Sequence, residues 1–226
     1  MVLKVSFLHL HRNLVLRYIE TGINSIFKMK EKILARASEM FLKLGFKSIT
    51  MDDIAGDMCI SKKTIYKYFC NKEVLVEEAT EMIHNQIHEI IDKIVALDYN
   101  AIEENFEIRI MFKEMFKSYD TSPVYQLKKH YPEIHAKVMT RELDECNKCF
   151  RQNLEKGIQQ GLYREGIDME TAVKFYYTLI FSINENTVSE KEAQRLELHA
   201  LEYHTRAIAT PKGVEELEKQ LLNPNI

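Results

Sequence analysis

The stretch from Ile60 to Leu75 gathers side chains that interact with nucleic-acid phosphates. Its lysines and hydroxyl-bearing residues are Ser61, Lys62, Lys63, Thr64, Tyr66, Lys67, Tyr68 and Lys72. Ammonium groups neutralise phosphates and release their counterions, and hydroxyl groups hydrogen-bond to phosphate oxygens. The residue types therefore predict binding to a polyanion, and double-stranded DNA is the leading candidate.

The distribution of charge favours the same conclusion. Residues 28–75 contain ten Lys and Arg residues against six Asp and Glu residues, and residues 1–27 carry a net charge of +2. Because the whole chain has a net charge of −3, residues 76–226 carry −9. A cationic front on an acidic body predicts that only the front meets the polyanion.

Helical phase predicts how these side chains are presented. Ile65 and Phe69 are four residues apart, so on a helix over residues 62–69 both point toward a core. The lysines, Thr64 and Tyr66 then fall largely on the outward side. Ser61 is a suitable N-cap for this helix, and Asn71 for a long helix that follows.

Two helices are expected before this one. Apolar residues recur at helical spacing from Met29, and Gly45 is placed to end that helix. Thr50 and Asp53 have the spacing of a capping box, which predicts a short helix from residue 51. Two short helices separated by about three residues, the second one basic, indicate a helix-turn-helix, whose second helix enters the major groove. The alternative is a solvated basic helix, but the agreement of caps, spacing and charge favours the DNA-binding motif.

From about Lys30 to Leu75 the sequence resembles TetR-type bacterial transcriptional regulators. The resemblance is carried by the Ala37…Phe41…Gly45-Phe46 spacing, by ITMDDIA at residues 49–55 and by ISKKTIYKYFCNKEVL at residues 60–75. It implies an N-terminal helix-turn-helix, a divergent helical ligand-binding and dimerisation domain, and a homodimeric repressor that binds a palindromic operator and is released by a small-molecule effector.

Roles for individual residues follow from the same resemblance. The positions that it assigns to phosphate contacts are Thr50, Ser61, Thr64, Tyr66 and Lys72. It assigns Lys62, Lys63 and Lys67 to base reading and Tyr68 to either role. Cys59 stands where the family has a turn glycine, so we expect left-handed backbone dihedrals there, at a cost of about 1 kcal/mol for a residue with a Cβ.

The predicted fold class is all-α, with an N-terminal three-helix DNA-binding domain over residues 28–75 and a helical effector-binding and dimerisation domain over residues 76–226. Chain breaks at residues 121–123, 130–132 and 210–211 separate helices in the second part. If the resemblance extends this far, helices near 168–187 and 190–209 form half of a two-fold, four-helix dimer interface. Burial within a single chain would explain their apolar stripes as well.

An effector pocket is expected among the middle helices, with an apolar ligand. Its candidate lining residues are Met111, Phe112, Met115, Phe116, Phe150 and Phe175, which are bulky and adaptable. Membership of an ordinary core is the alternative for each of them.

Two further constellations have spacings that metal or redox chemistry uses. Cys146 and Cys149 lie three apart, but no second cysteine pair follows, and four unevenly spaced cysteines in the chain indicate a reducing compartment. His84 and His88 lie four apart without the glutamate of a zinc-protease motif. We therefore predict no metal, no cofactor and no catalytic residues.

Two other classes of function remain open at this point. An enzyme on a helical scaffold would need a convergent nucleophile, base and oxyanion donors, and the sequence offers none. A DNA-associated interaction module would bind random and selected duplexes equally.

The first 27 residues lie outside the family pattern. They are apolar in patches that charged residues interrupt, which predicts neither a membrane helix nor a secretory signal. They are interpreted either as a poorly ordered extension or as translation assigned upstream of a start at Met29. A cytoplasmic location without membrane attachment is expected.

Overall fold

The computed structural model describes residues 29–223, so the predicted extension over residues 1–27 lies outside the described range. Every regular element in this range is an α-helix, which confirms the predicted all-α class. In chain order these are α2 (Met29–Leu44), α3 (Met51–Asp57), α4 (Lys62–Tyr66), α5 (Lys72–Val95), α6 (Ala101–Phe116), α7 (Pro123–His130), α8 (Pro132–Gln159), α9 (Met169–Asn186), α10 (Glu190–Ile208) and α11 (Pro211–Leu221).

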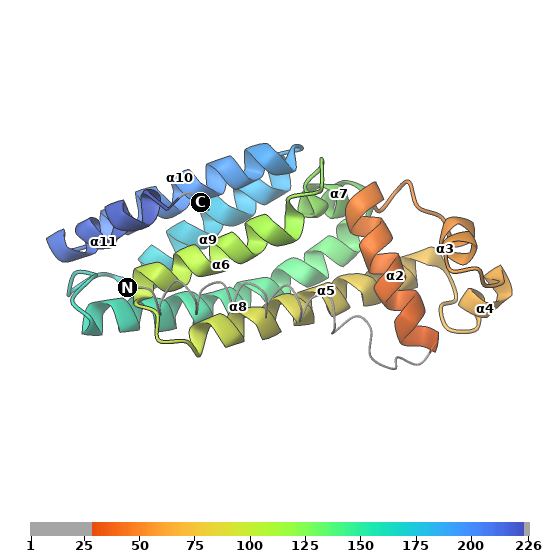
Figure 1. The fold of residues 1–226 in the computed structure, drawn as a ribbon, viewed down its shortest axis with the longest axis horizontal. Coiled ribbons are helices and arrows are strands. Elements are labelled where there is room, and N and C mark those ends of the chain that lie inside the picture. Colours follow the sequence, from red (N-terminus) through yellow and green to blue (C-terminus); the bar gives the residue numbers. More distant parts are fainter. Residues whose placement is uncertain (1–28, 224–226) are drawn as a thin grey trace, which may run out of the picture.

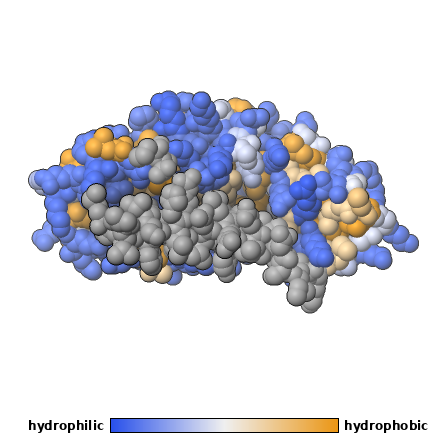
Figure 2. Space-filling view, in the orientation of Figure 1, coloured by the Kyte–Doolittle hydropathy of each residue, from blue (hydrophilic) through white to orange (hydrophobic). Residues whose placement is uncertain are grey.

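The molecule is elongated, with α2, α3 and α4 at one end (Figure 1). Helices α5 and α8 run lengthwise beneath α6, α9 and α10, and α11 lies at the opposite end from α4 (Figure 1). None of the helices within residues 29–223 combines the length and the apolar character needed to cross a bilayer. The face in Figure 2 is mostly hydrophilic, and hydrophobic residues reach it only in separate groups.

The predicted end of α2 and the predicted starts of α3, α4 and α5 are confirmed. Gly45 follows α2 with a φ of 94°, a conformation that glycine adopts without strain. Thr50 and Asp53 form the capping box of α3, and Ser61 caps α4. Asn71 caps α5 by accepting a hydrogen bond from the Val74 backbone N–H at 2.9 Å. Each cap satisfies a backbone donor that the helix itself leaves without a partner.

Cys59 has a φ of 53°, which confirms the expected left-handed turn between α3 and α4. The turn is held by backbone hydrogen bonds: Cys59 N donates to Gly56 O at 3.1 Å, and Ile60 N donates to Ala55 O at 3.0 Å. These bonds offset the strain of a residue with a Cβ in this conformation.

The front helices share one core with the beginning of α5. Phe41, Ile54, Ile65 and Phe69 are fully buried in it, which confirms the predicted inward phase of Ile65 and Phe69. Leu127 of α7 belongs to the same cluster, so the front also packs against the body of the molecule.

An ion pair joins two of the front helices at the surface. Arg36 of α2 donates to Asp57 of α3 through Nε to Oδ2 at 2.5 Å and through Nη2 to Oδ1 at 2.7 Å. This two-pronged geometry lowers the pKa of the Asp57 carboxyl through its hydrogen bonds to Arg36. The pair links α2 to α3 across the surface, above the core that the two helices share.

The body contains a buried polar network between α6 and α8. Glu104 is 3% exposed, and it accepts hydrogen bonds from Lys156 Nζ and Asn153 Nδ2, both at 2.7 Å. Asn153 Oδ1 accepts in turn from Asn105 Nδ2 at 2.9 Å and from the Tyr163 hydroxyl at 3.3 Å. A buried carboxylate with these partners specifies one alignment of α6 against α8.

Candidate nucleic-acid interface

The residues predicted to contact DNA lie together on α4 and beside the helix ends next to it. Thr50, Ser61, Lys62, Lys63, Tyr66, Lys67 and Tyr68 are exposed, and Thr64 and Lys72 are half-buried. Because the buried side of α4 consists of Ile65, with Phe69 just beyond the helix, the opposite side is open to a duplex. Their assignment to DNA contacts remains a prediction.

Helix α4 is shorter than predicted. It ends at Tyr66, whereas the sequence pattern predicted a helix through residue 69. The chain tightens there because both Tyr68 N and Phe69 N donate to Ile65 O, at 2.9 and 3.1 Å. Lys67 and Tyr68 therefore lie in the turn that leads to α5, where they extend the surface that α4 presents.

The hydroxyl groups at the helix starts are already oriented by their caps. Ser61 Oγ lies 2.8 Å from Thr64 Oγ1, and the Thr64 backbone N–H donates to Ser61 Oγ at 3.1 Å. Thr50 Oγ1 donates to Asp53 Oδ2 at 2.7 Å. The hydrogen bonds that Asp53 accepts from the hydroxyl and the backbone N–H of Thr50 lower the pKa of its carboxyl and favour the ionised form. Hydroxyl oxygens held in this way can still interact with a phosphate on their open side.

Lys62 forms an ion pair with a neighbouring residue of the same exposed surface, because its Nζ lies 2.7 Å from Asp52 Oδ2. This hydrogen bond raises the pKa of the Lys62 ammonium. Within the described part of the chain, neither Lys63 nor Lys67 forms an ion pair. Lys63 and Lys67 are therefore the lysines of α4 and its turn that can meet DNA without breaking an existing bond.

Replacing Asp52 by asparagine should tighten DNA binding. The change removes a negative charge beside the duplex and releases Lys62 for a phosphate, while an exposed ion pair of this kind contributes at most about 1 kcal/mol to stability. We expect roughly fivefold tighter binding at about 0.1 M salt, measured by fluorescence anisotropy. Glu165→Gln, the same charge change at an exposed site outside the surface, is the control and should leave affinity unchanged. Equal effects of the two variants would contradict a local role for Asp52.

Lys72 begins α5 and lies where the front meets the body. Its Nζ donates to Lys47 O at 3.1 Å and lies 5.9 Å from the ring centroids of both Phe41 and Tyr131. Partial burial lowers the pKa of this ammonium. Its position beside the open backbone N–H groups of a helix start suits a phosphate contact.

Replacing Lys72 by alanine should weaken binding to all DNA sequences by a similar factor, because a phosphate contact carries no base information. The slope of log affinity against log salt should fall by about one for each bound subunit. Affinities measured over a salt series on two unrelated duplexes would test this prediction. An unchanged slope would exclude Lys72 as a phosphate contact.

A cavity of about 310 Å³ lies within the body. Its lining comes from each of the helices α5 to α10, and also includes Leu42 and Phe46 of the front. Of the six predicted lining residues, Phe112, Phe116 and Phe150 contribute to its wall. Met111 and Met115 pack instead in a cluster with α5 residues, and Phe175 is 65% exposed on α9. The role of all six in binding a ligand remains a prediction.

The charged groups in the cavity wall were not predicted from the sequence. Arg109 donates to Gln194 O at 3.0 Å, but its Nε and Nη1 are buried without a hydrogen-bond partner. Glu197 accepts from Asn184 Nδ2 at 2.6 Å, and burial raises the pKa of its carboxyl. A charged residue next to the apolar stripe of a helix is the sequence feature that could have indicated these groups, as with Arg109 after Ile108.

Comparisons with known proteins agree with this geometry. The family model described as "Bacterial regulatory proteins, tetR family" matches residues 33–79, which span most of α2, all of α3 and α4, and the start of α5. The transcriptional regulator YdeS of Bacillus subtilis is 26% identical over 153 residues, which are 66% of this chain and 74% of YdeS. The regulator IcaR of Staphylococcus aureus is 27% identical over 89 residues, which are 39% of this chain and 45% of IcaR.

Solved structures show the same fold. A transcriptional regulator from Cytophaga hutchinsonii superposes with a TM-score of 0.65 at 18% identity, covering 80% of this chain and 98% of that one. The helix-turn-helix, the match to the family model and the related regulators lead to one conclusion: residues 33–79 form a DNA-binding domain of the TetR family, and the chain as a whole is similar to transcriptional regulators.

Proposed function

We propose that the protein is a homodimeric repressor that binds a palindromic operator in the cytoplasm and releases it when a small molecule enters the cavity. The observation that carries this proposal is the exposed basic surface of α4, held by a core that leaves Lys63 and Lys67 without ion pairs among residues 29–223. IcaR, which is 27% identical to the chain over 89 residues, is described as a negative transcriptional regulator of the biofilm operon icaADBC, and this supports repression.

The exposed apolar residues of α9 and α10 support a dimer. Phe175 and Leu179 lie four residues apart on α9 and are 65% and 39% exposed, and Tyr203 on α10 is 71% exposed. Aromatic and apolar side chains on two adjacent long helices are typical of an interface between copies of one chain. Two subunits would place two α4 helices in successive major grooves about 34–36 Å apart.

The cavity supports release by an effector. Its aromatic wall suits an apolar molecule, and its volume lies at the lower end of the range for small-molecule sites. Because Leu42 and Phe46 of the front line the same cavity as residues of α9 and α10, an occupant would contact both the DNA-binding end and the proposed dimer helices. Such a ligand releases DNA only to the extent that it prefers the arrangement of subunits that no longer fits the operator.

Selection of bound fragments from random DNA would test the function. A palindrome whose half-sites lie about 10 base pairs apart, or a multiple of this distance, is the expected result. Equal affinity for random and selected duplexes would contradict a sequence-specific regulator. Sedimentation of the wild type and of Phe175→Asp/Tyr203→Asp should show a dimer and a monomer, respectively. A dimer that survives both charges would exclude this face.

A further inference from the structure

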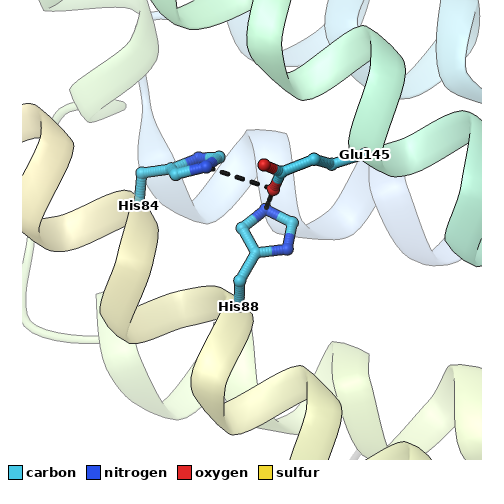
Figure 3. Close-up of side chains that lie close together, drawn as sticks. All are labelled: His84, His88 and Glu145. Atoms are coloured by element: carbon cyan, nitrogen blue, oxygen red, sulfur yellow. Dashed lines mark ion pairs between the residues drawn. The ribbon is translucent and has the colours of Figure 1, made fainter.

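Two histidines of α5 face two glutamates of α8 beside the cavity. His84 and His88 share one side of α5, and their ring centroids lie 4.4 Å apart. Glu142 and Glu145 lie three residues apart on α8 and point back toward them. Figure 3 shows both imidazole rings directed at the Glu145 carboxylate. The spacing of the histidines did not predict this arrangement, because the carboxylates come from a distant segment.

The two ring nitrogens of His84 have different partners. Nδ1 lies 2.5 Å from Glu142 Oε1, and Nε2 lies 3.1 Å from Glu145 Oε2. When Nδ1 donates its proton to Glu142, the lone pair of Nε2 is directed at the space beside Glu145. A carboxylate that orients a histidine through the nitrogen that is not the ligand is a recurrent feature of metal sites. Only 5% of the His84 side chain is exposed, so packing holds the ring in place.

His88 completes the group. Its Nε2 lies 3.0 Å from Glu145 Oε2, yet this nitrogen is buried and makes no hydrogen bond of acceptable geometry. One donor atom from each of His84, His88 and Glu145 lies within 4.8 Å of the other two. Three ligands at about 2.0–2.2 Å from a tetrahedral ion would lie about 3.3–3.6 Å from one another. Glu145 Oε2 is already close to this separation, at 3.1 Å from His84 Nε2 and 3.0 Å from His88 Nε2.

We propose that His84, His88 and Glu145 bind one divalent transition-metal ion of the zinc class, with Glu142 positioning His84. Two imidazoles and one carboxylate favour such an ion over calcium or magnesium, which prefer oxygen ligands. Three protein ligands leave a fourth position for water or for a group of a molecule in the cavity, whose wall includes both histidines. This proposal is independent of DNA binding and of the dimer.

The alternative occupant of this space is a proton, which would turn the group into ordinary histidine–glutamate ion pairs. A direct measurement of metal binding distinguishes the metal ion from the proton. The untagged full-length chain, stripped with a chelator, should bind one Zn²⁺ per chain in competition with a chromophoric chelator. With Co²⁺ it should develop visible absorption of tetrahedral type. Absence of saturable Zn²⁺ binding would overturn the proposal.

The Zn²⁺ affinities of variants at the proposed ligands would show where the ion binds. His88→Gln and Glu145→Gln should each weaken Zn²⁺ binding by at least about 100-fold. Glu142 positions His84 and its Oε2 also lies 3.5 Å from His88 Nε2, so Glu142→Gln should weaken binding by roughly 10- to 100-fold. His88 and Glu145 are the preferred targets, because their side chains are 19% and 41% exposed and tolerate substitution better than His84. Circular dichroism would verify that each variant is folded.

Matched controls test three of the other histidines. His199→Gln, on the exposed part of α10, and the double variant His9→Gln/His11→Gln should bind Zn²⁺ like the wild type. Full affinity in both His88→Gln and Glu145→Gln, or loss of binding in the His9/His11 variant, would overturn the assignment.

Discussion

Replacing both Lys63 and Lys67 by glutamate should abolish site-specific DNA binding while the protein stays folded. Both side chains are exposed, and neither forms an ion pair within the described residues, so the fold loses no ion pair with them. Each subunit loses two positive charges that attract DNA and gains two negative charges that repel it, at the surface proposed to read bases. In a dimer the effect is doubled, and we expect a loss of at least about 1,000-fold, the lower end of the usual margin between specific and non-specific binding.

Anisotropy titrations with the selected operator would measure this loss, and unfolding curves would verify stability. The control is Lys148→Glu/Arg151→Glu, which makes the same change in net charge at two exposed positions of α8. It should reduce affinity only slightly, because screening limits the effect of charges far from the duplex. If both double variants lost affinity equally, net charge rather than the surface of α4 would govern binding.

The sequence was most informative where one hydrogen bond within a few residues decides the structure. Thr50, Ser61 and Asn71 cap helices because each side-chain oxygen reaches a backbone N–H three residues ahead. Cys59 was predicted to be left-handed because it stands where the TetR-type family has a turn glycine, and its φ of 53° agrees. Such features depend on local chemistry, so the rest of the fold does not change them.

Features that depend on distant partners could not be predicted. Helical spacing identified the apolar residues of α9, but not that Phe175 lies on the exposed side while Tyr176 is buried. His84 and Glu142 are 58 positions apart in sequence and 2.5 Å apart in space, and only the packing of α5 against α8 brings them together. Periodicity tells which side of a helix is apolar, but it does not tell which element covers that side.

The second large effect is expected at Gly157, in the last turns of α8. A Cβ at this position would overlap the ring of Tyr163, whose side chain is 1% exposed. The ring cannot retreat easily. The Gly157 carbonyl accepts hydrogen bonds from Leu162 N at 2.8 Å and Tyr163 N at 3.1 Å, and the Tyr163 hydroxyl donates to Asn153. Gly157→Ala should therefore lower the free energy of unfolding by about 3 kcal/mol, at the upper end of ordinary overpacking.

Thermal unfolding would test this prediction, with an expected fall in midpoint of about 6–12 °C for a chain of this size. Gly56→Ala is the matched control, because Gly56 lies at an exposed position of helix α3 and a Cβ there meets no atom within 4 Å. It should raise stability by up to about 1 kcal/mol, since alanine loses less backbone entropy on folding. In a Tyr163→Leu background the smaller side chain makes room, so Gly157→Ala should cost much less than in the wild type. The same cost in both backgrounds would show that the ring is not what requires glycine at this position.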